Sequence, residues 1–235
     1  MSTPTKWSRN KIMKLRPDTS DIKAYREVVE KKGYERRDFK PESGEKWLDI
    51  GAHIGSFSWL YRKEGVEIIA FEPCKNAYEM LCQNSYGNNI RAGLSDFDGD
   101  ATMSRNTAKG NEWRNSIYKK WQRGTDEMVE IQHVKHYIEP GINIKLDNEG
   151  AEKQILDYLI GSGEIKNVNK LVFEWSFDIN KDVRDYMKVL RGLEKTHKLL
   201  NVTENHKEKY GKLIEYPASW FPAAFKVFAV KKSDV

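Results

Sequence analysis

The sequence predicts an α/β protein with a mostly parallel central sheet and helices on both faces. Apolar segments of strand length alternate with longer segments of helical spacing. Glycine and proline stand where several of the helical segments begin or end. The resulting order, strand–helix–strand–helix–strand followed by further strands, is typical of parallel sheets whose crossover helices cover both faces.

The predicted elements follow one another from residue 19 to residue 232. Strands are expected over residues 46–50, 66–72, 89–95, 128–134, 142–147, 169–175 and 225–232. Helices are expected over residues 19–33, 55–65, 73–87, 151–160 and 181–195. The first two helices end at Gly33 and Gly65, and the third begins with Pro73 at its first helical position. Residues 105–127 have no clear period, so a loop is expected there.

The charge is concentrated near the N-terminus. Residues 1–46 contain 13 Lys or Arg and eight Asp or Glu, whereas the remaining residues contain 27 of each. Two interpretations stay open: a solvated helical arm, or a basic arm for an anionic partner such as nucleic acid or a nucleotide-linked substrate. We therefore divide the chain into a basic, partly helical N-terminal extension (residues 1–44) and a main domain (residues 45–235), as its length allows.

Several classes of protein are disfavoured. The chain has no apolar run near the roughly 18 residues that a membrane helix needs, and its first residues lack the apolar segment of a secretory signal. The two cysteines, Cys74 and Cys82, form neither a CxxC pair nor a cluster with histidine. They are expected to be free thiols of a reducing compartment. These features predict a cytoplasmic protein without a membrane partner.

Acidic residues gather at the predicted carboxyl ends of the strands. Ligands of open parallel sheets bind beyond these strand ends. Buried strands do not need acids there for stability, so the pattern predicts a binding site. The residues at these positions are Asp49, Glu72, Ser95 with Asp96, Asp147 and Glu174.

The turn after the first strand, 49-DIGAHIGSF-57, has nucleotide-site character without matching a common fingerprint. It lacks GxxxxGK[ST], and His53 replaces the second glycine of GxGxxG. Gly51 and Gly55 still permit a tight turn and close backbone approach to a ligand. Glu72 ends the next strand, 23 residues after Asp49, where a carboxylate can accept both hydroxyls of a ribose.

Four segments together resemble the FkbM family of S-adenosylmethionine-dependent methyltransferases. They are DIGAHIGSF (residues 49–57), AFEP (70–73), LSDFDG (94–99) and IKLDNEGAE (144–152). The last segment is the most specific, and the resemblance covers roughly residues 46–175. Asn148 stands where the family usually has an apolar residue, and the segment around Arg91 is a polar version of an apolar strand.

The resemblance implies a Rossmann-like class I methyltransferase fold with S-adenosylmethionine in the turn. Asp49 and the backbone of the turn would face the methionine part, Glu72 would bind the ribose, and Ser95 with Asp96 would lie near adenine. The full set of cofactor-binding residues that it implies is Asp49, Gly51, Ala52, His53, Gly55, Phe57, Glu72, Pro73, Ser95 and Asp96.

The chemistry is expected around 145-KLDNEG-150. Methyl transfer to an alcohol needs an in-line oxygen nucleophile and removal of its proton. Asp147, Glu149 and Glu174 are candidates for the general base, or for holding a divalent Mg²⁺ or Mn²⁺ ion. Lys145 alternates with Asp147 and is either a catalytic cation that orients the nucleophile or a structural ion-pair partner. Glu149 has a structural alternative as well, because acids stabilise the first turn of a helix.

Three functions remain open. The favoured one is an O-methyltransferase that acts on a hydroxyl of a sugar, glycan or small molecule. The second is an RNA ribose 2′-O-methyltransferase, since such enzymes carry a Lys–Asp–Lys–Glu tetrad; Asp147 and Glu174 match its acids, and its two lysines have no assignment. The third is a cofactor-binding module without turnover. Nucleic acid is a less favoured partner than a small acceptor, and the oligomeric state is left open.

Overall fold

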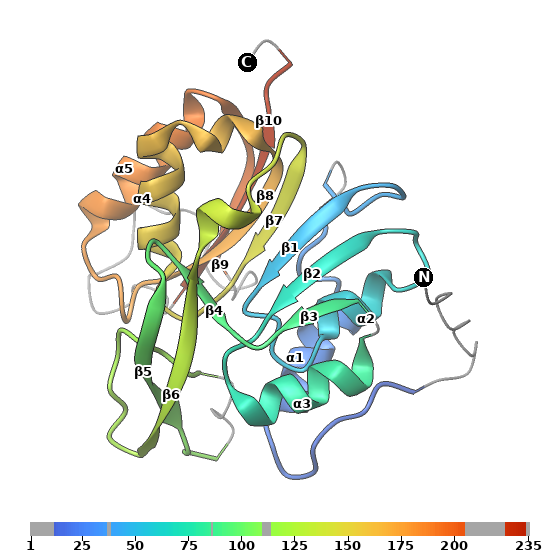
Figure 1. Cartoon of the computed structure of the whole chain (residues 1–235). Coiled ribbons are helices and arrows are strands. Elements are labelled where there is room, and N and C mark those ends of the chain that lie inside the picture. The colour runs from blue at the N-terminus through green and yellow to red at the C-terminus, as the bar shows by residue number, and fades with distance from the viewer. Residues whose placement is uncertain (1–11, 37–38, 86, 110–113, 205–223, 234–235) are drawn as a thin grey trace.

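The computed structural model describes residues 12–36, 39–85, 87–109, 114–204 and 224–233. The helices are α1 (Asp21–Tyr25), the π-helix η1 (Arg26–Glu30), α2 (Ser56–Tyr61), α3 (Lys75–Asn84), the 3₁₀ helix η2 (Val134–Tyr137), α4 (Glu152–Ser162), the 3₁₀ helix η3 (Glu164–Asn167) and α5 (Val183–Glu194). The strands are β1 (Lys46–Ile50), β2 (Glu67–Phe71), β3 (Asn88–Ile90), β4 (Gly93–Ser95), β5 (Gly99–Asn106), β6 (Gly124–His133), β7 (Ile142–Leu146), β8 (Val168–Ser176), β9 (His197–Glu204) and β10 (Ala224–Lys231) (Figure 1).

A seven-stranded sheet in the order β3-β2-β1-β7-β8-β10-β9 forms the centre of the molecule. The pairings from β3 to β8 are all parallel, and β10 runs antiparallel to both of its neighbours. The predicted α/β class with a mostly parallel sheet is therefore confirmed. The parallel strands end at one edge, which is where the sequence places its acids.

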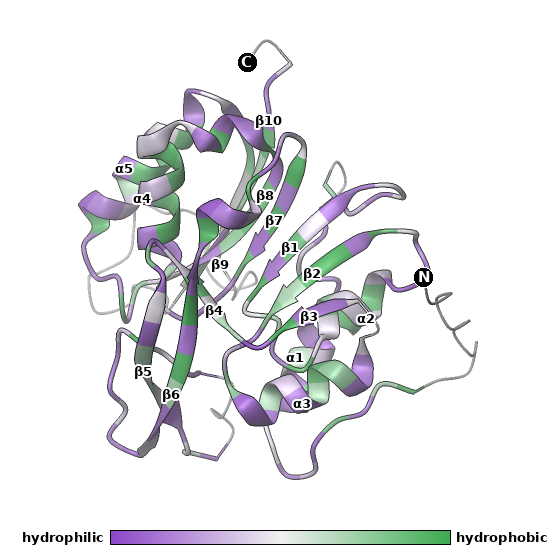
Figure 2. Cartoon of the chain, viewed as in Figure 1, coloured by the Kyte–Doolittle hydropathy of each residue, from purple (hydrophilic) through white to green (hydrophobic). Residues whose placement is uncertain are grey.

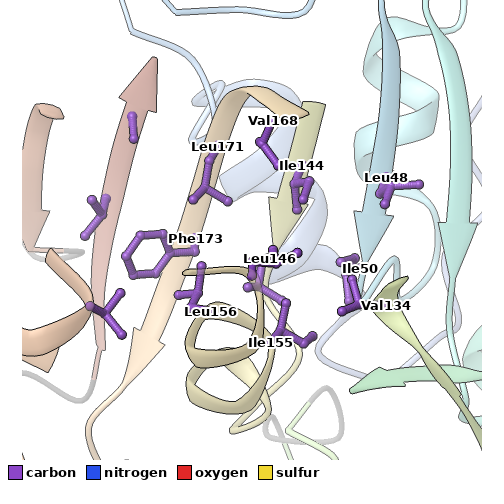
Figure 3. Close-up of a cluster of buried hydrophobic side chains, with 14 of the residues drawn as sticks. Leu48, Ile50, Val134, Ile144, Leu146, Ile155, Leu156, Val168, Leu171 and Phe173 are labelled. Carbon is purple, nitrogen blue, oxygen red and sulfur yellow. The ribbon is translucent and has the colours of Figure 1, made fainter. Parts of the chain in front are cut away.

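Alternating side chains of the strands divide the interior into two layers. On one face, Leu48 and Ile50 belong to the cluster that includes residues of α4 and α5. Figure 3 shows Leu156 of α4 near Leu146 and Phe173 of the sheet. On the other face, Trp47 packs with residues of α2, α3 and the N-terminal segment. Each fully buried side chain of this kind stabilises the fold by about 1.5–3 kcal/mol. Figure 2 shows the hydrophobic colour concentrated on the central strands.

The segment after α3 differs from the prediction. The strand expected over residues 89–95 is two strands in two different sheets, because the chain bends at Arg91 and Ala92. β3 pairs with β2, whereas β4 joins a small three-stranded sheet in the order β4-β6-β5. β6 begins at Gly124, so the end of the expected loop 105–127 is a strand. β9 was not predicted, because its polar sequence directly follows α5 without a glycine or proline to separate them.

The described part of the N-terminal extension packs against the sheet. Helix α1 continues into the π-helix η1, so the helix expected over residues 19–33 is confirmed in place, with π geometry in its second half. Asp21 is fully buried and accepts hydrogen bonds from Arg16. Tyr34 and Phe39 are 2% and 1% exposed and lie in the same cluster as Trp47. The described part of this segment therefore packs into the same core as the sheet.

Two further expectations concern the cysteines and the absence of membrane-spanning helices. Both Cys74 and Cys82 are free, the first buried and the second exposed. Within the residues that the structure describes, no helix has the length and apolar character required to cross a membrane.

Candidate functional site

A cavity of about 770 Å³ lies at the carboxyl ends of the parallel strands. The N-terminal segment forms one wall, and the turn after β1 and the ends of β2, β7 and β8 form the others. Ten of the predicted site residues line it: Gly51, Ala52, His53, Phe57, Glu72, Pro73, Lys145, Asp147, Glu149 and Glu174. Four do not line it: Asp49, Gly55, Ser95 and Asp96.

The turn after β1 requires glycine at Gly51. Its φ is +81°, and a Cβ there would lie 1.9 Å from the carbonyl oxygen of Asp147. The amides of Gly51 and Ala52 both donate to the carbonyl of Phe71, at 3.1 and 2.9 Å. The turn is thus held between the strand ends of β2 and β7, and its backbone borders the cavity without side chains in the way.

Replacing Gly51 by Ala is expected to lower the free energy of unfolding by at least about 1–3 kcal/mol. The strain of a left-handed backbone at a residue with a side chain adds to the clash of the new Cβ with a main-chain carbonyl. The measurement is urea unfolding followed by circular dichroism. Gly161→Ala is the matched control, since a Cβ at this helical glycine meets open space. The control should leave stability unchanged or raise it by up to about 1 kcal/mol. Equal stability of Gly51→Ala and the wild type would contradict the geometry of the turn.

Glu72 is fixed at the end of β2 by the backbone on both sides of it. One carboxylate oxygen accepts the His53 amide at 2.9 Å and the other accepts the Cys74 amide at 2.8 Å. The side chain is 7% exposed. Burial raises the pKa of the Glu72 carboxyl to about 7, in spite of these two hydrogen bonds. Each oxygen keeps a further lone pair for a donor from the cavity.

One ring nitrogen of His53 has no hydrogen-bond partner among the residues that the structure describes. Its Nε2 lies 3.3 Å from the Arg16 guanidinium, which can only donate, so we assign the proton to Nδ1. Burial lowers the pKa of His53 to about 4, which leaves the ring neutral near neutral pH. Among the described residues, Nδ1 has no hydrogen-bond partner. A buried donor at the cavity wall is a feature that a bound polar ligand would satisfy.

Asp49 and Lys145 form a buried ion pair beneath the turn. The ammonium lies 3.0 Å from Asp49 Oδ1 and donates to the carbonyl of Gly51 at 2.6 Å. Burial raises the pKa of Asp49, and Lys145 opposes this rise. Burial disfavours the charge of Lys145 too, but Asp49 and Asp147 raise the pKa of its ammonium. Asp49 thus holds Lys145 and the turn, and Lys145 presents a cation to the cavity.

Asp147 stands in a second cluster, which crosses three elements. The hydroxyl of Tyr34 donates to Asp147 Oδ2. The ammonium groups of Lys226 and Lys145 lie 4.0 and 5.4 Å from the centre of the Tyr34 ring. Lys226 is opposite Glu174 in the β10–β8 register, 3.5 Å from its carboxylate, and it pairs with Glu27 at 2.7 Å. A carboxylate, a phenol and two cations therefore meet at one wall of the cavity.

Glu149 occupies a different environment. Its φ is +52°, and its carboxylate lies 3.4 Å from Arg114, which also contacts Asp178 at 2.6 Å. Burial raises the pKa of the Glu149 carboxyl well above its usual range, and Arg114 opposes this only in part. Ser116 donates to the Glu149 carbonyl at 2.6 Å, so the chain after β5 covers this part of the site.

A divalent metal ion at Asp147, Glu149 and Glu174 stays a prediction. In the described ranges, no three Asp, Glu, His or Cys side chains gather in a way that could hold a metal ion. Each of the three acids contacts another protein side chain: Tyr34, Arg114 and Lys226, respectively.

Ser95 and Asp96, the two residues expected near adenine, are not part of the cavity lining. Ser95 is fully buried, with its hydroxyl 2.9 Å from that of Tyr118, and Asp96 is exposed. Three residues of the site were missed in the sequence: Tyr34, Arg114 and Lys226. Of these, only Lys226 carried a signal, since it interrupts the apolar strand 225-FKVFAV-230.

The chain can now be compared with known proteins. Residues 49–199 match the family described as the methyltransferase FkbM domain. No curated protein matches the chain by sequence.

Solved structures of similar fold include several methyltransferases. A fibrillarin/Nop5p complex has 14% identity and a TM-score of 0.48, over 88% of this chain and 82% of that one. An rRNA methylase from Streptococcus thermophilus has 10% identity and a TM-score of 0.45, over 81% and 89%. A TehB-like S-adenosylmethionine-dependent methyltransferase from Corynebacterium glutamicum has 11% identity and a TM-score of 0.43, over 81% and 82%. At such identities the acceptor must be argued from this chain's own residues.

Proposed function

We propose, from the premise that this chain belongs to the FkbM methyltransferase family, that it methylates a hydroxyl oxygen of a sugar, glycan or small molecule. The family establishes the class of reaction, which is methyl transfer from S-adenosylmethionine, and the fold is the Rossmann-like class I methyltransferase fold. The atom that accepts the methyl group is the part we propose. It rests on one observation: the Asp147 carboxylate lines the cavity and accepts the hydroxyl of Tyr34, whose ring lies close to two buried lysines.

The residues of the turn fit the cofactor. Glu72 offers carboxylate lone pairs to the ribose hydroxyls, and the orphaned Nδ1–H of His53 offers a donor. The glycine backbone at Gly51 allows close approach, because any side chain there would collide with the main chain of Asp147. When bound, S-adenosylmethionine supplies an electrophilic methyl group on its sulfonium.

Asp147 suits the role of general base. Its Oδ2 accepts the Tyr34 hydroxyl, which leaves Oδ1 for the proton of an acceptor hydroxyl. Oδ1 would take the proton of the acceptor hydroxyl, and the acceptor oxygen would receive the methyl group that bound S-adenosylmethionine supplies. The ammonium groups of Lys145 and Lys226 stabilise the negative charge that develops on the acceptor oxygen.

A specific observation also favours the second candidate, a ribose 2′-hydroxyl of RNA. The two lysines that the sequence left unassigned are Lys145 and Lys226, which stand beside Asp147 and Glu174. The four side chains make up a Lys–Asp–Lys–Glu set. Both candidates use an alcohol as acceptor, so the same base serves either one.

The test has two stages. Calorimetry with S-adenosylhomocysteine measures the cofactor site. The protein is then incubated with methyl-labelled S-adenosylmethionine and panels of free sugars, sugar phosphates, oligosaccharides and short RNAs, and the labelled product is examined by NMR. A methyl ether supports the proposal, and its position separates a glycan from a ribose 2′-oxygen. Cofactor binding with label only on nitrogen or carbon would overturn the O-methyl assignment.

Tyr34→Phe is expected to lower kcat about 10- to 100-fold with little change in the affinity for S-adenosylhomocysteine. A hydrogen bond to a charged group contributes about 1.5–3 kcal/mol, and here it holds the base in position. Steady-state kinetics on the acceptor found above provide the measurement.

The matched control for Tyr34→Phe is Tyr61→Phe. Tyr61 is a buried tyrosine whose hydroxyl donates to Glu35 at 2.9 Å, and it does not line the cavity. Both variants lose a similar bond to a carboxylate, so their losses of stability should be comparable. If kcat fell equally in the two variants, the effect of Tyr34 would be one of stability and not of positioning.

A further inference from the structure

The cavity has two chemically different ends. At one end, the turn after β1 and Glu72 form the cofactor wall. At the other end, the N-terminal segment contributes Lys23, Arg26, Lys31 and Arg36 to the lining. The catalytic cluster lies between these ends, because Tyr34 of the N-terminal segment bonds Asp147 at the carboxyl end of β7. An acceptor that reaches Asp147 opposite the cofactor must therefore lie against the basic segment.

The π-helix η1 directs two of these cations to the same side. The amide of Lys31 donates to the carbonyl of Arg26 at 2.9 Å, the i to i+5 bond of a π-turn. In an α-helix, residues five apart point about 140° away from each other. The π-turn instead stacks Arg26 above Lys31, and both line the cavity. Single π-turns of this kind are frequent at functional sites.

These two cations have no anionic partner within the described ranges. Both side chains are exposed, and neither Arg26 nor Lys31 forms an ion pair there. Glu27, which follows Arg26, is paired with Lys226 instead, and Glu30, which precedes Lys31, is exposed and forms no ion pair with either cation within the described ranges. Solvated lysines are common. Arg26 and Lys31, however, lie on the same face of a π-turn at the cavity wall, and two neighbouring cations in this position can bind an anion.

The charged residues that line the cavity also favour an anionic ligand. Five acids line it, namely Glu27, Glu72, Asp147, Glu149 and Glu174, against seven Lys or Arg residues. Burial raises the pKa of Glu149 well above its usual range and that of Glu72 to about 7, which disfavours the charged form of both carboxyls. The lining is then cationic, and the sulfonium of the cofactor adds to this charge. A negatively charged acceptor balances it.

We infer that the acceptor is a phosphorylated small molecule whose phosphate group binds to Arg26 and Lys31, with Lys23 beside them. This inference rests on the proposed function, for it names the acceptor class of the same site. A sugar phosphate and a nucleotide-linked sugar share this chemistry. RNA fits less well, because a polyanion needs basic contacts over many phosphates. Outside residues 1–46, acidic and basic residues are equal in number.

The experiment is calorimetry on the full chain with inorganic phosphate, pyrophosphate, glucose 1-phosphate, UDP and glucuronate, with and without saturating S-adenosylhomocysteine. The test variant is Arg26→Gln with Lys31→Gln. The control variant is Lys63→Gln with Lys166→Gln, which removes the same charge from exposed lysines outside the cavity. We expect at least one phosphate probe to bind, at least tenfold more weakly to the test variant, and equally to the control and the wild type.

The probe that binds most tightly distinguishes the two classes of phosphorylated acceptor. Preference for glucose 1-phosphate indicates a sugar phosphate, and preference for UDP indicates a nucleotide-linked sugar. No binding of any phosphate probe to the folded protein overturns the inference. The inference is also overturned if both double variants bind the phosphate probes equally more weakly than the wild type, or if glucuronate binds more tightly than the phosphate probes. If a 12-nucleotide RNA bound more tightly than every small probe, with a steep salt dependence, the inference would fail and the acceptor would be RNA.

Binding of S-adenosylhomocysteine in the same samples keeps the two hypotheses apart. If the cofactor product binds and the phosphate probes do not, the inference fails and the methyltransferase proposal stands. If phosphate binds at Arg26 and Lys31 but the cofactor product does not bind, the anion site stands and the methyltransferase proposal fails.

Discussion

Asp147→Asn is expected to lower kcat by about 10²- to 10⁴-fold, the usual contribution of a general base, while the affinity for S-adenosylhomocysteine should stay within about threefold. Asparagine keeps the volume of the side chain and can still accept the Tyr34 hydroxyl through its oxygen. It cannot take a proton from the acceptor. The variant therefore separates binding from chemistry, and kcat measured at saturating cofactor reports the difference.

The control for this variant is Asp157→Asn. Asp157 is an ion-paired aspartate on α4, 2.7 Å from Lys153, and it lies outside the cavity. Circular dichroism and thermal unfolding show whether each variant is folded. If folded Asp147→Asn kept kcat within threefold of the wild type, another group would be the base. A large loss in Glu174→Gln would then identify Glu174, which stands beside Lys226 in the same cluster.

The location of the site was predictable because it depends on short-range sequence pattern. Each strand ends where its apolar run stops, so acids such as Asp147 and Glu174 mark one edge of the sheet before the order of strands is known. The turn at Gly51 was predictable for the same reason, since only glycine combines a positive φ with main-chain contact on both sides.

The partners of these acids were not predictable, because they come from distant parts of the chain. Tyr34 precedes Asp147 by 113 residues, and nothing near Tyr34 indicates that its hydroxyl will face a carboxylate. The same holds for Glu149 and Glu174, because their partners Arg114 and Lys226 also come from distant parts of the chain.

The site therefore extends beyond the family-matched residues 49–199 at both ends. Tyr34 comes from before this range and Lys226 from after it, and both contribute to the wall around Asp147. The residues that we propose to hold the cofactor lie mainly inside the range. This division suits an enzyme whose cofactor site is common to a family while its acceptor wall belongs to the individual chain.

The protonation of Glu72 links cofactor affinity to pH. Its pKa in the folded protein is about 7, above the ordinary value of 4.5. Between these values the folded state holds a proton that the unfolded state has lost, so the contribution of Glu72 to stability is fully present below 4.5 and is lost as the pH rises through 7. Ribose hydroxyls donate to the ionised form. Binding is thus expected to release the proton, and affinity should rise with pH up to about 7.

Glu72→Gln is accordingly expected to bind S-adenosylhomocysteine at least tenfold more weakly at pH 8, about 1.4 kcal/mol, and to lose the pH dependence. Wild-type affinity should rise by up to about tenfold per pH unit from pH 5.5 to 7 and then level off. Calorimetry across this range provides the measurement. Glu152→Gln is the control: burial raises the pKa of Glu152 to about 8, but its side chain lies outside the cavity. If the pH dependence survived in Glu72→Gln, the carboxylate would not be the group that receives the ribose.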